Sequence, residues 1–182
     1  ARSGLDPELA GAEAREDRRP PCEHTHLAVV GRERHELRLG REHLALEPAP
    51  VGDALREAIA AADDRGNGRH RFSVQVEPSD LAVRADREKL GQVLGNLLDN
   101  AVRYTPDGGA ITVSARRRSS AAEITVADDG IGISEPDQQR VFTKFFRSER
   151  AAGARGSGLG LFLVRGLVTA MGGRVWLESE EG

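Results

Sequence analysis

The stretch of residues 87–103 constrains the fold most strongly, because its apolar residues recur with the period of an α-helix. Asp86 stands directly before this stretch, where a helix N-cap is expected, and the turn-forming run 105–109 follows it. We therefore predict an amphipathic helix with one face in a hydrophobic core. The apolar residues on that face are Leu90, Val93, Leu94, Leu97, Leu98, Ala101 and Val102.

Shorter patterns surround this helix. Alternating apolar and polar residues predict strands at 71–76, 82–84, 110–115, 123–127 and 174–178, of which the third and fourth form a hairpin. Helical patterns occur at 53–62, between a glycine-rich turn at 130–132 and Phe146, and at 161–171. Helices interspersed with hairpin strands predict an α+β fold, a two-layer sandwich of helices on a mixed sheet.

Residues 1–45 differ from the rest of the chain. They are rich in Arg and Glu, contain Pro20-Pro21 and show no sustained period. We predict a poorly packed polar tail there, with at most a short helix over residues 32–39, followed by one folded domain over residues 46–182. A length of 182 residues accommodates one such domain.

Bulk properties exclude several classes of protein. A net charge of −3 argues against a general nucleic-acid binder, which would be clearly basic. The single cysteine, Cys22, rules out an intramolecular disulfide and suits a reducing compartment. No apolar stretch approaches the roughly 18–20 residues of a membrane span. We expect a cytoplasmic domain without membrane contact of its own, even if it belongs to a membrane-anchored sensor.

A polar stripe accompanies the apolar face of the long helix. Gln92, Asn96, Asn100 and Arg103 are spaced four, four and three residues apart, so they share one side of the helix. Asparagine is a mediocre helix former, and two aligned asparagines in mid-helix need a reason. One reading is a solvated flank. The other is a row of carbonyl oxygens that faces a polar ligand, with Asn100 as an oxygen ligand for Mg²⁺.

Two glycine-rich segments follow. The strand 123–127 leads into Asp128, and Gly130 and Gly132 then keep one side of the turn free of side chains. A carboxylate there can accept a hydrogen bond from the exocyclic amine of a flat heterocycle. The segment 156–160, Gly-Ser-Gly-Leu-Gly, directly precedes a helix, where backbone N–H groups converge on phosphate. Alone, these segments could equally be a tight turn and a flexible linker.

Between the glycine segments lies a cluster of phenylalanines. Three of the five phenylalanines of the chain fall within residues 142–146. We expect Phe142 to pack against the core. Lys144 and Arg147 then stand at the start of a flexible stretch, where cations could fold over phosphates.

In their order along the chain, these segments resemble the histidine-kinase branch of the ATPase superfamily that includes DNA gyrase, the ninety-kilodalton heat-shock chaperone and the mismatch-repair ATPases. The matching segments are 92–106, 128–132, 142–147 and 156–160. The resemblance implies that ATP and Mg²⁺ bind between helices and a flexible lid, roughly residues 147–155. It identifies the chain as the catalytic domain of a sensor histidine kinase of a two-component system.

The resemblance also implies roles for individual residues. Asn100 would bind Mg²⁺ with Asn96 beside it, Tyr104 would lie against adenine, and Asp128 would accept a hydrogen bond from the adenine amine. Asn96, Asn100 and Arg147 are the candidate catalytic residues. The candidate nucleotide-binding residues are Asn96, Asn100, Arg103, Tyr104, Asp128, Gly130, Gly132, Lys144, Arg147, Gly156, Ser157, Gly158, Leu159 and Gly160.

Position 96 indicates the reaction. Hydrolytic members of the superfamily carry a glutamate there that activates water, and anti-sigma serine kinases also carry an acid. Asn96 cannot serve as a general base. We therefore expect transfer of the γ-phosphoryl group to a histidine of a dimerisation hairpin, from which a response regulator is then phosphorylated. The alternatives are a non-catalytic ATP-binding module and an anti-sigma-type serine kinase.

The sequence departs from the family pattern in three places. His35 is followed by Glu-Leu-Arg, as in a phosphoacceptor motif, but Leu39-Gly40 replaces the expected Thr-Pro. Residues 1–45 would then be the end of the hairpin and a linker, so we expect dimerisation only through a hairpin missing from this chain. The final strand of the family pattern is also missing, which would expose a sheet edge. Cys22, His24 and His26 could suggest a metal site, but without a second ligand cluster we expect a polar tail.

Overall fold

The computed structural model describes residues 25–32, 44–119, 121–148 and 156–181, of which residues 25–32 are described as backbone. The elements in chain order are β1 (Thr25–Arg32), β2 (Glu47–Pro50), α1 (Val51–Arg65), β3 (Arg71–Glu77), β4 (Ala82–Ala85), α2 (Arg87–Tyr104), β5 (Ala110–Arg118), β6 (Ala121–Asp128), α3 (Glu135–Gln138), α4 (Gly160–Ala170) and β7 (Arg174–Ser179).

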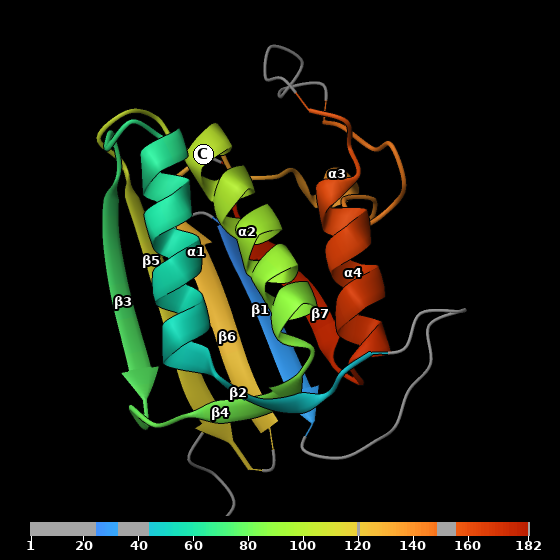
Figure 1. Cartoon of the computed structure of the whole chain (residues 1–182). Coiled ribbons are helices and arrows are strands. Elements are labelled where there is room, and N and C mark those ends of the chain that lie inside the picture. Colours follow the sequence, from blue (N-terminus) through green and yellow to red (C-terminus); the bar gives the residue numbers. More distant parts are fainter. Residues whose placement is uncertain (1–24, 33–43, 120, 149–155, 182) are drawn as a thin grey trace, which may run out of the picture.

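The strands form one large sheet and one small one. The five-stranded sheet has the order β3-β5-β6-β1-β7, and β2 pairs with β4 separately. β3 runs parallel to β5, whereas the other neighbours are antiparallel. Helices α1, α2 and α4 lie side by side across one face of the large sheet (Figure 1). The predicted α+β sandwich with a mixed sheet is therefore confirmed.

Helix α2 forms the centre of the core, as its sequence pattern predicted. The Asp86 side chain caps the helix by accepting a hydrogen bond from the Lys89 N–H at 3.1 Å. Six of the seven predicted apolar residues are buried, and only Val102 is partly exposed. They join one hydrophobic cluster with α1, β5, β6 and α4. Burial of each leucine contributes about 1.5–3 kcal/mol, so this face alone anchors the helix on the sheet.

Strand β1 corrects the expectation of a polar tail for residues 25–32. This segment lies inside the large sheet, antiparallel to β6 on one side and to β7 on the other. Ala28, for example, pairs with both Thr125 and Trp176. The run Leu27–Val30 was too short to reveal a strand by its period, and its partners lie far along the chain. The predicted helix over 32–39 falls almost wholly outside the described residues.

The segment after β6 also differs from its prediction. The expected helix up to Phe146 is reduced to α3, a single turn, and residues 139–145 form turns. Phe145 has a φ of 64°, which a continuous right-handed helix does not permit. Most of the predicted lid, residues 149–155, lies outside the described residues. Among the helices that the structure describes, none is long and apolar enough to cross a membrane.

Candidate functional site

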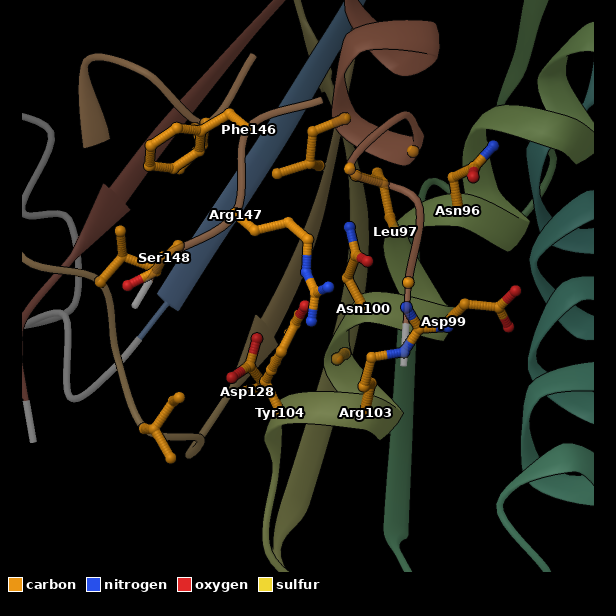
Figure 2. A pocket seen from close by; sticks show the side chains of 18 of the residues that line it. Asn96, Leu97, Asp99, Asn100, Arg103, Tyr104, Asp128, Phe146, Arg147 and Ser148 are labelled. Atoms are coloured by element: carbon orange, nitrogen blue, oxygen red, sulfur yellow. The ribbon is translucent and has the colours of Figure 1, made fainter. Parts of the chain in front are cut away.

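A cavity of about 260 Å³ opens between α2, the end of β6, the turn that follows β6, and the start of α4. Figure 2 shows Asn100, Tyr104, Asp128 and Arg147 grouped around this pocket. Most of the predicted site residues line it. They are Asn96, Asn100, Arg103, Tyr104, Asp128, Gly132, Arg147, Gly156, Ser157, Gly158 and Gly160.

Three predicted residues do not line the cavity. Gly130 is buried behind it, in the turn after β6. Leu159 stands at the N-cap of α4, outside the lining. The Lys144 ammonium lies 4.9 Å from the centre of the Phe145 ring rather than at the pocket. The sequence could not separate these three from their neighbours, because adjacent residues of a turn point in different directions.

At one end of the cavity, Asp128 leads into a tightly bound turn. The Gly130 N–H donates to Oδ1 of Asp128 at 3.1 Å, and the Ile131 N–H donates to the Tyr104 carbonyl at 3.2 Å. A Cβ on Gly130 would lie only 2.7 Å from that carbonyl oxygen, so the turn can approach the end of α2 only with glycine there. The Gly130 N–H thereby helps to orient the carboxylate at the edge of the cavity.

The same end has an apolar wall that the sequence analysis missed. Ile131, Ile133 and Val141 line the cavity together with Leu97 of α2. Ile131 is 38% exposed, so part of its side chain is accessible in the cavity lining. A flat apolar ring would cover these side chains while its polar edge met Asp128. The isoleucines that alternate with glycines after Asp128 were the available signal.

The opposite end of the cavity is polar. The Asn96 side chain donates to the Gln92 carbonyl at 2.8 Å, so its amide oxygen is directed away from that bond. A Cβ on Gly160 would lie 3.2 Å from the Asn96 oxygen and 3.8 Å from the Asn100 carboxamide. The second glycine segment therefore lies directly over both asparagines. Nothing else in the described part of the chain bonds to the Asn100 side chain, which faces the cavity (Figure 2).

Two arginines border this polar end. A Cβ on Gly156 would lie 2.5 Å from Nη1 of Arg103, which shows that the guanidinium reaches the second glycine segment. Arg147 extends toward Asn100 and Asp128 in Figure 2. Backbone N–H groups at the start of α4 and two guanidinium groups favour an anion of several charges at this end.

The phenylalanine segment supports the second glycine segment. The Phe145 N–H donates to the Gly158 carbonyl at 3.0 Å. Both residues have positive φ, 64° for Phe145 and 69° for Gly158. A non-glycine residue in this conformation costs on the order of 1 kcal/mol, and it is retained here because the surrounding bonds fix it. Phe142 is partly buried against the core, as expected.

Asp99 is the remaining acid of the cavity lining. Its Oδ1 lies 2.6 Å from a guanidinium nitrogen of Arg65, and its side chain points away from Asn100 toward α1 (Figure 2). Asp128 belongs to the opposite end. Among the described residues that line the cavity, no carboxylate therefore stands free beside the two asparagines.

The oxygen donors of the cavity suit a metal ion that is already bound to the phosphates of a nucleotide. Within the described residues no group of three His, Cys, Asp or Glu side chains could hold a metal ion alone. Mg²⁺ commonly takes one or two protein oxygens and completes its shell with phosphate oxygens and water. The Asn100 carboxamide, open to the cavity, fits that pattern. The side chains of Cys22, His24 and His26 lie outside the described part, as does His35.

Comparison with known proteins agrees with this geometry. The family model for the histidine kinase-, DNA gyrase B- and HSP90-like ATPases matches residues 85–182, which is more than half of the chain. The chain belongs to this family. The match covers every element that lines the cavity, from the start of α2 to the start of α4, and continues through β7.

The similar proteins are sensor kinases. The adaptive-response sensory kinase SasA of Gloeothece citriformis is 38% identical over 79% of this chain and 36% of its own length. The sensor-like histidine kinase SenX3 of Mycobacterium bovis is 43% identical over 72% of this chain and 32% of its own. The chain thus spans about a third of the curated relatives it matches.

A solved structure extends the likeness to the fold. The mycobacterial sensor histidine kinase MprB superposes with a TM-score of 0.63 at 32% identity, covering 70% of this chain and 81% of the MprB chain.

Proposed function

We propose that this chain binds Mg-ATP and transfers the γ-phosphoryl group to a histidine on a phosphoacceptor hairpin in two-component signalling. The observation that carries the proposal is the polar end of the cavity, where two asparagines face the second glycine segment and, among the described lining residues, no free carboxylate accompanies them. Asparagine cannot act as a general base for water, so an acceptor that is nucleophilic without losing a proton first, such as a neutral imidazole, is favoured.

Each part of the cavity has a role in this reaction. The apolar wall and Asp128 hold adenine, whereas Arg103, Arg147 and the N–H groups of residues 156–160 hold the phosphates. The Asn100 oxygen would hold Mg²⁺, which supplies charge neutralisation at the β- and γ-phosphates. Positioning and charge compensation then carry the catalysis.

The transfer balances without further reactants. The unprotonated imidazole nitrogen of the acceptor histidine attacks the γ-phosphorus, and the bond from that phosphorus to the β–γ bridging oxygen breaks. ADP leaves with the electron pair, and the proton on the other ring nitrogen is released to water. The product is a phosphohistidine, from which a response regulator would receive the group.

The test uses γ-labelled ATP, Mg²⁺, this chain and separately made phosphoacceptor hairpins taken from several curated relatives. We expect label on the hairpin that is lost in acid, and none on a hairpin whose histidine is replaced by glutamine. Acid-stable label on a serine would instead indicate a serine kinase. Tight ATP binding without label on any hairpin would indicate a non-catalytic module.

A further inference from the structure

The turn after β6 is fastened to the C-terminal end of β7. The Ile133 N–H donates to Oγ of Ser179 at 2.9 Å. The Gln138 side-chain amide nitrogen lies 2.8 Å from the Ile133 carbonyl and 2.7 Å from the Ser179 carbonyl. All three bonds are partly buried. The two bonds to Ser179 join residues more than 40 positions apart, whereas the bond from Gln138 to Ile133 is local. We call Gln138 and Ser179, with these bonds, the latch.

The latch leaves little freedom for the turn. Gly132 has a φ of 66°, and a Cβ there would collide with the Glu180 carbonyl, so the backbone of the turn packs directly on the chain that leaves β7. The opposite side of the turn is bonded to α2 through Ile131 and Tyr104. The turn is therefore clamped between α2 and β7, and the latch is the β7 side of that clamp.

The clamped turn forms the base end of the cavity. Ile131, Gly132 and Ile133 line the cavity directly. The turn also orients the acid, because the Gly130 N–H bonds to Oδ1 of Asp128. A displaced turn would carry Gly130 with it and lengthen the bond by which this N–H orients the Asp128 carboxylate. Discrimination between bases depends on that orientation, since it decides which ligand atoms face an acceptor.

Gln138 suits this role because its amide has two hydrogens. One is directed to each of two carbonyl oxygens, so both donors are used. Glutamate is nearly the same shape but has no donor, and it would place a carboxylate against two carbonyl oxygens. Gln139, the next residue, is exposed, and its side chain has no hydrogen bond in the described part of the chain. The two glutamines therefore form a matched pair.

We propose that Gln138 and Ser179 are positioning residues that set the preference of this cavity for adenine over guanine. They touch no ligand themselves and act through the turn and Asp128. The inference rests on the proposed function, because it presupposes that the cavity holds a purine nucleotide.

The experiment measures dissociation constants for ATP and GTP by displacement of a fluorescent ATP analogue, on the full chain with Mg²⁺. In Gln138→Ala and Gln138→Glu the constant for ATP should rise about tenfold, which corresponds to about 1.4 kcal/mol, because Asp128 is less well oriented. The constant for GTP should change by less than about twofold, so the preference for adenine falls. Gln139→Ala and Gln139→Glu should match the wild type with both nucleotides.

Ser179→Ala keeps the test valid if the Gln138 variants fold poorly. It removes only the Oγ that accepts from the Ile133 N–H. We expect faster hydrogen exchange at the Ile133 amide and unchanged exchange in β5. The preference for ATP over GTP should fall less than in the Gln138 variants. A proportional rise of both constants in the latch variants would show a merely structural role and overturn the inference. So would unchanged constants. If the wild type binds ATP, the results for the variants test the latch alone. If the wild type binds no nucleotide, the proposed function itself is refuted.

Discussion

The two ends of the cavity are built differently. The base end is closed by hydrogen bonds within the protein, from Gly130 to Asp128, from Ile131 to α2 and through the latch to β7. At the polar end, which we call the phosphate end after the proposed function, Gly156, Ser157 and Arg147 are exposed, and the Asn100 carboxamide has no partner among the described residues. The base end is held by hydrogen bonds within the protein, whereas the phosphate end presents polar groups that could bind a ligand.

This difference suggests that selection of the base and binding of the triphosphate depend on different ends of the cavity. A preformed base end can reject a wrong base, because its donors and acceptors are already fixed. A phosphate end with two guanidinium groups and a glycine-rich backbone would instead hold the nucleotide through the charge of its phosphates. Substitutions at the base end should therefore change which nucleotide binds, and substitutions at the phosphate end should change how strongly any triphosphate binds.

The largest effect is expected for Asn100→Ala. Loss of the proposed metal ligand should remove the Mg²⁺ dependence of nucleotide binding and lower the affinity for Mg-ATP on the order of a hundredfold. Asn100→Asp keeps an oxygen and should perturb binding less. Titration of a fluorescent ATP analogue with and without Mg²⁺ measures both. Gln92→Ala, on the same side of α2 but outside the cavity, is the control. A wild-type Mg²⁺ dependence in Asn100→Ala would refute the metal assignment.

The next effect concerns Asp128→Asn, which tests the base end. Asparagine can still accept from the Gly130 N–H, but its amide group would then face the adenine amine. We expect ATP affinity to fall about ten- to a hundredfold, as for a lost charge-assisted hydrogen bond of about 1.5–3 kcal/mol. GTP affinity should fall less or rise, since guanine presents an oxygen there. Competition binding gives both values. Equal affinity of the wild type for ATP and GTP would contradict the role of Asp128.

A proline in β1 tests whether the base end depends on the N-terminal strand. β1 is the neighbour that joins β7, and thus the latch, to the sheet. Ala28→Pro removes a ladder N–H in the sheet interior, so the free energy of unfolding should fall by about 1–3 kcal/mol. Ala28→Ser keeps that N–H and is the control in urea unfolding. Equal stability of the two variants would mean that residues 25–32 do not pair in the sheet.

The contrast between α2 and β1 shows what the sequence could predict. The pattern of α2 is local: its apolar period, its Asp86 cap and its polar stripe all lie within 18 residues, and its predicted core residues are confirmed. β1 has only the short run Leu27–Val30, and its partners are strands β6 and β7. Pairing over such distances leaves no signal in a single segment, so the strand was read as tail.

The site divides in the same way. The asparagines, Asp128 and the glycine segments stand in motifs, and the structure brings them to one cavity. The apolar wall was missed although isoleucines alternate with glycines after Asp128. The latch could not be predicted, because Gln138 and Ser179 meet only where α3 lies against β7. The position of Lys144 beside Phe145 depends on a backbone with positive φ, which no periodicity announces.

The smallest effects compare two glycines near α4. Gly158 has a φ of 69°, and a Cβ there would lie 2.7 Å from the Phe146 carbonyl, whereas a Cβ on Gly166 would meet nothing within 4 Å. Gly158→Ala should lower the free energy of unfolding by about 1–2 kcal/mol. Gly166→Ala should raise it by about 0.5–1 kcal/mol, since alanine is favoured inside a helix. Thermal unfolding measures both, and a stabilising Gly158→Ala would contradict the geometry of the phosphate end.

The most direct measurement follows γ-labelled ATP with this chain and Mg²⁺, first alone and then with a phosphoacceptor hairpin. Because Asn96 offers no base, we expect very slow release of inorganic phosphate and no label on the chain itself, followed by acid-labile label on the hairpin once it is added. Rapid phosphate release without the hairpin would contradict transfer as the reaction. Acid-labile label on the chain that disappears in His35→Gln would show that the chain carries its own acceptor.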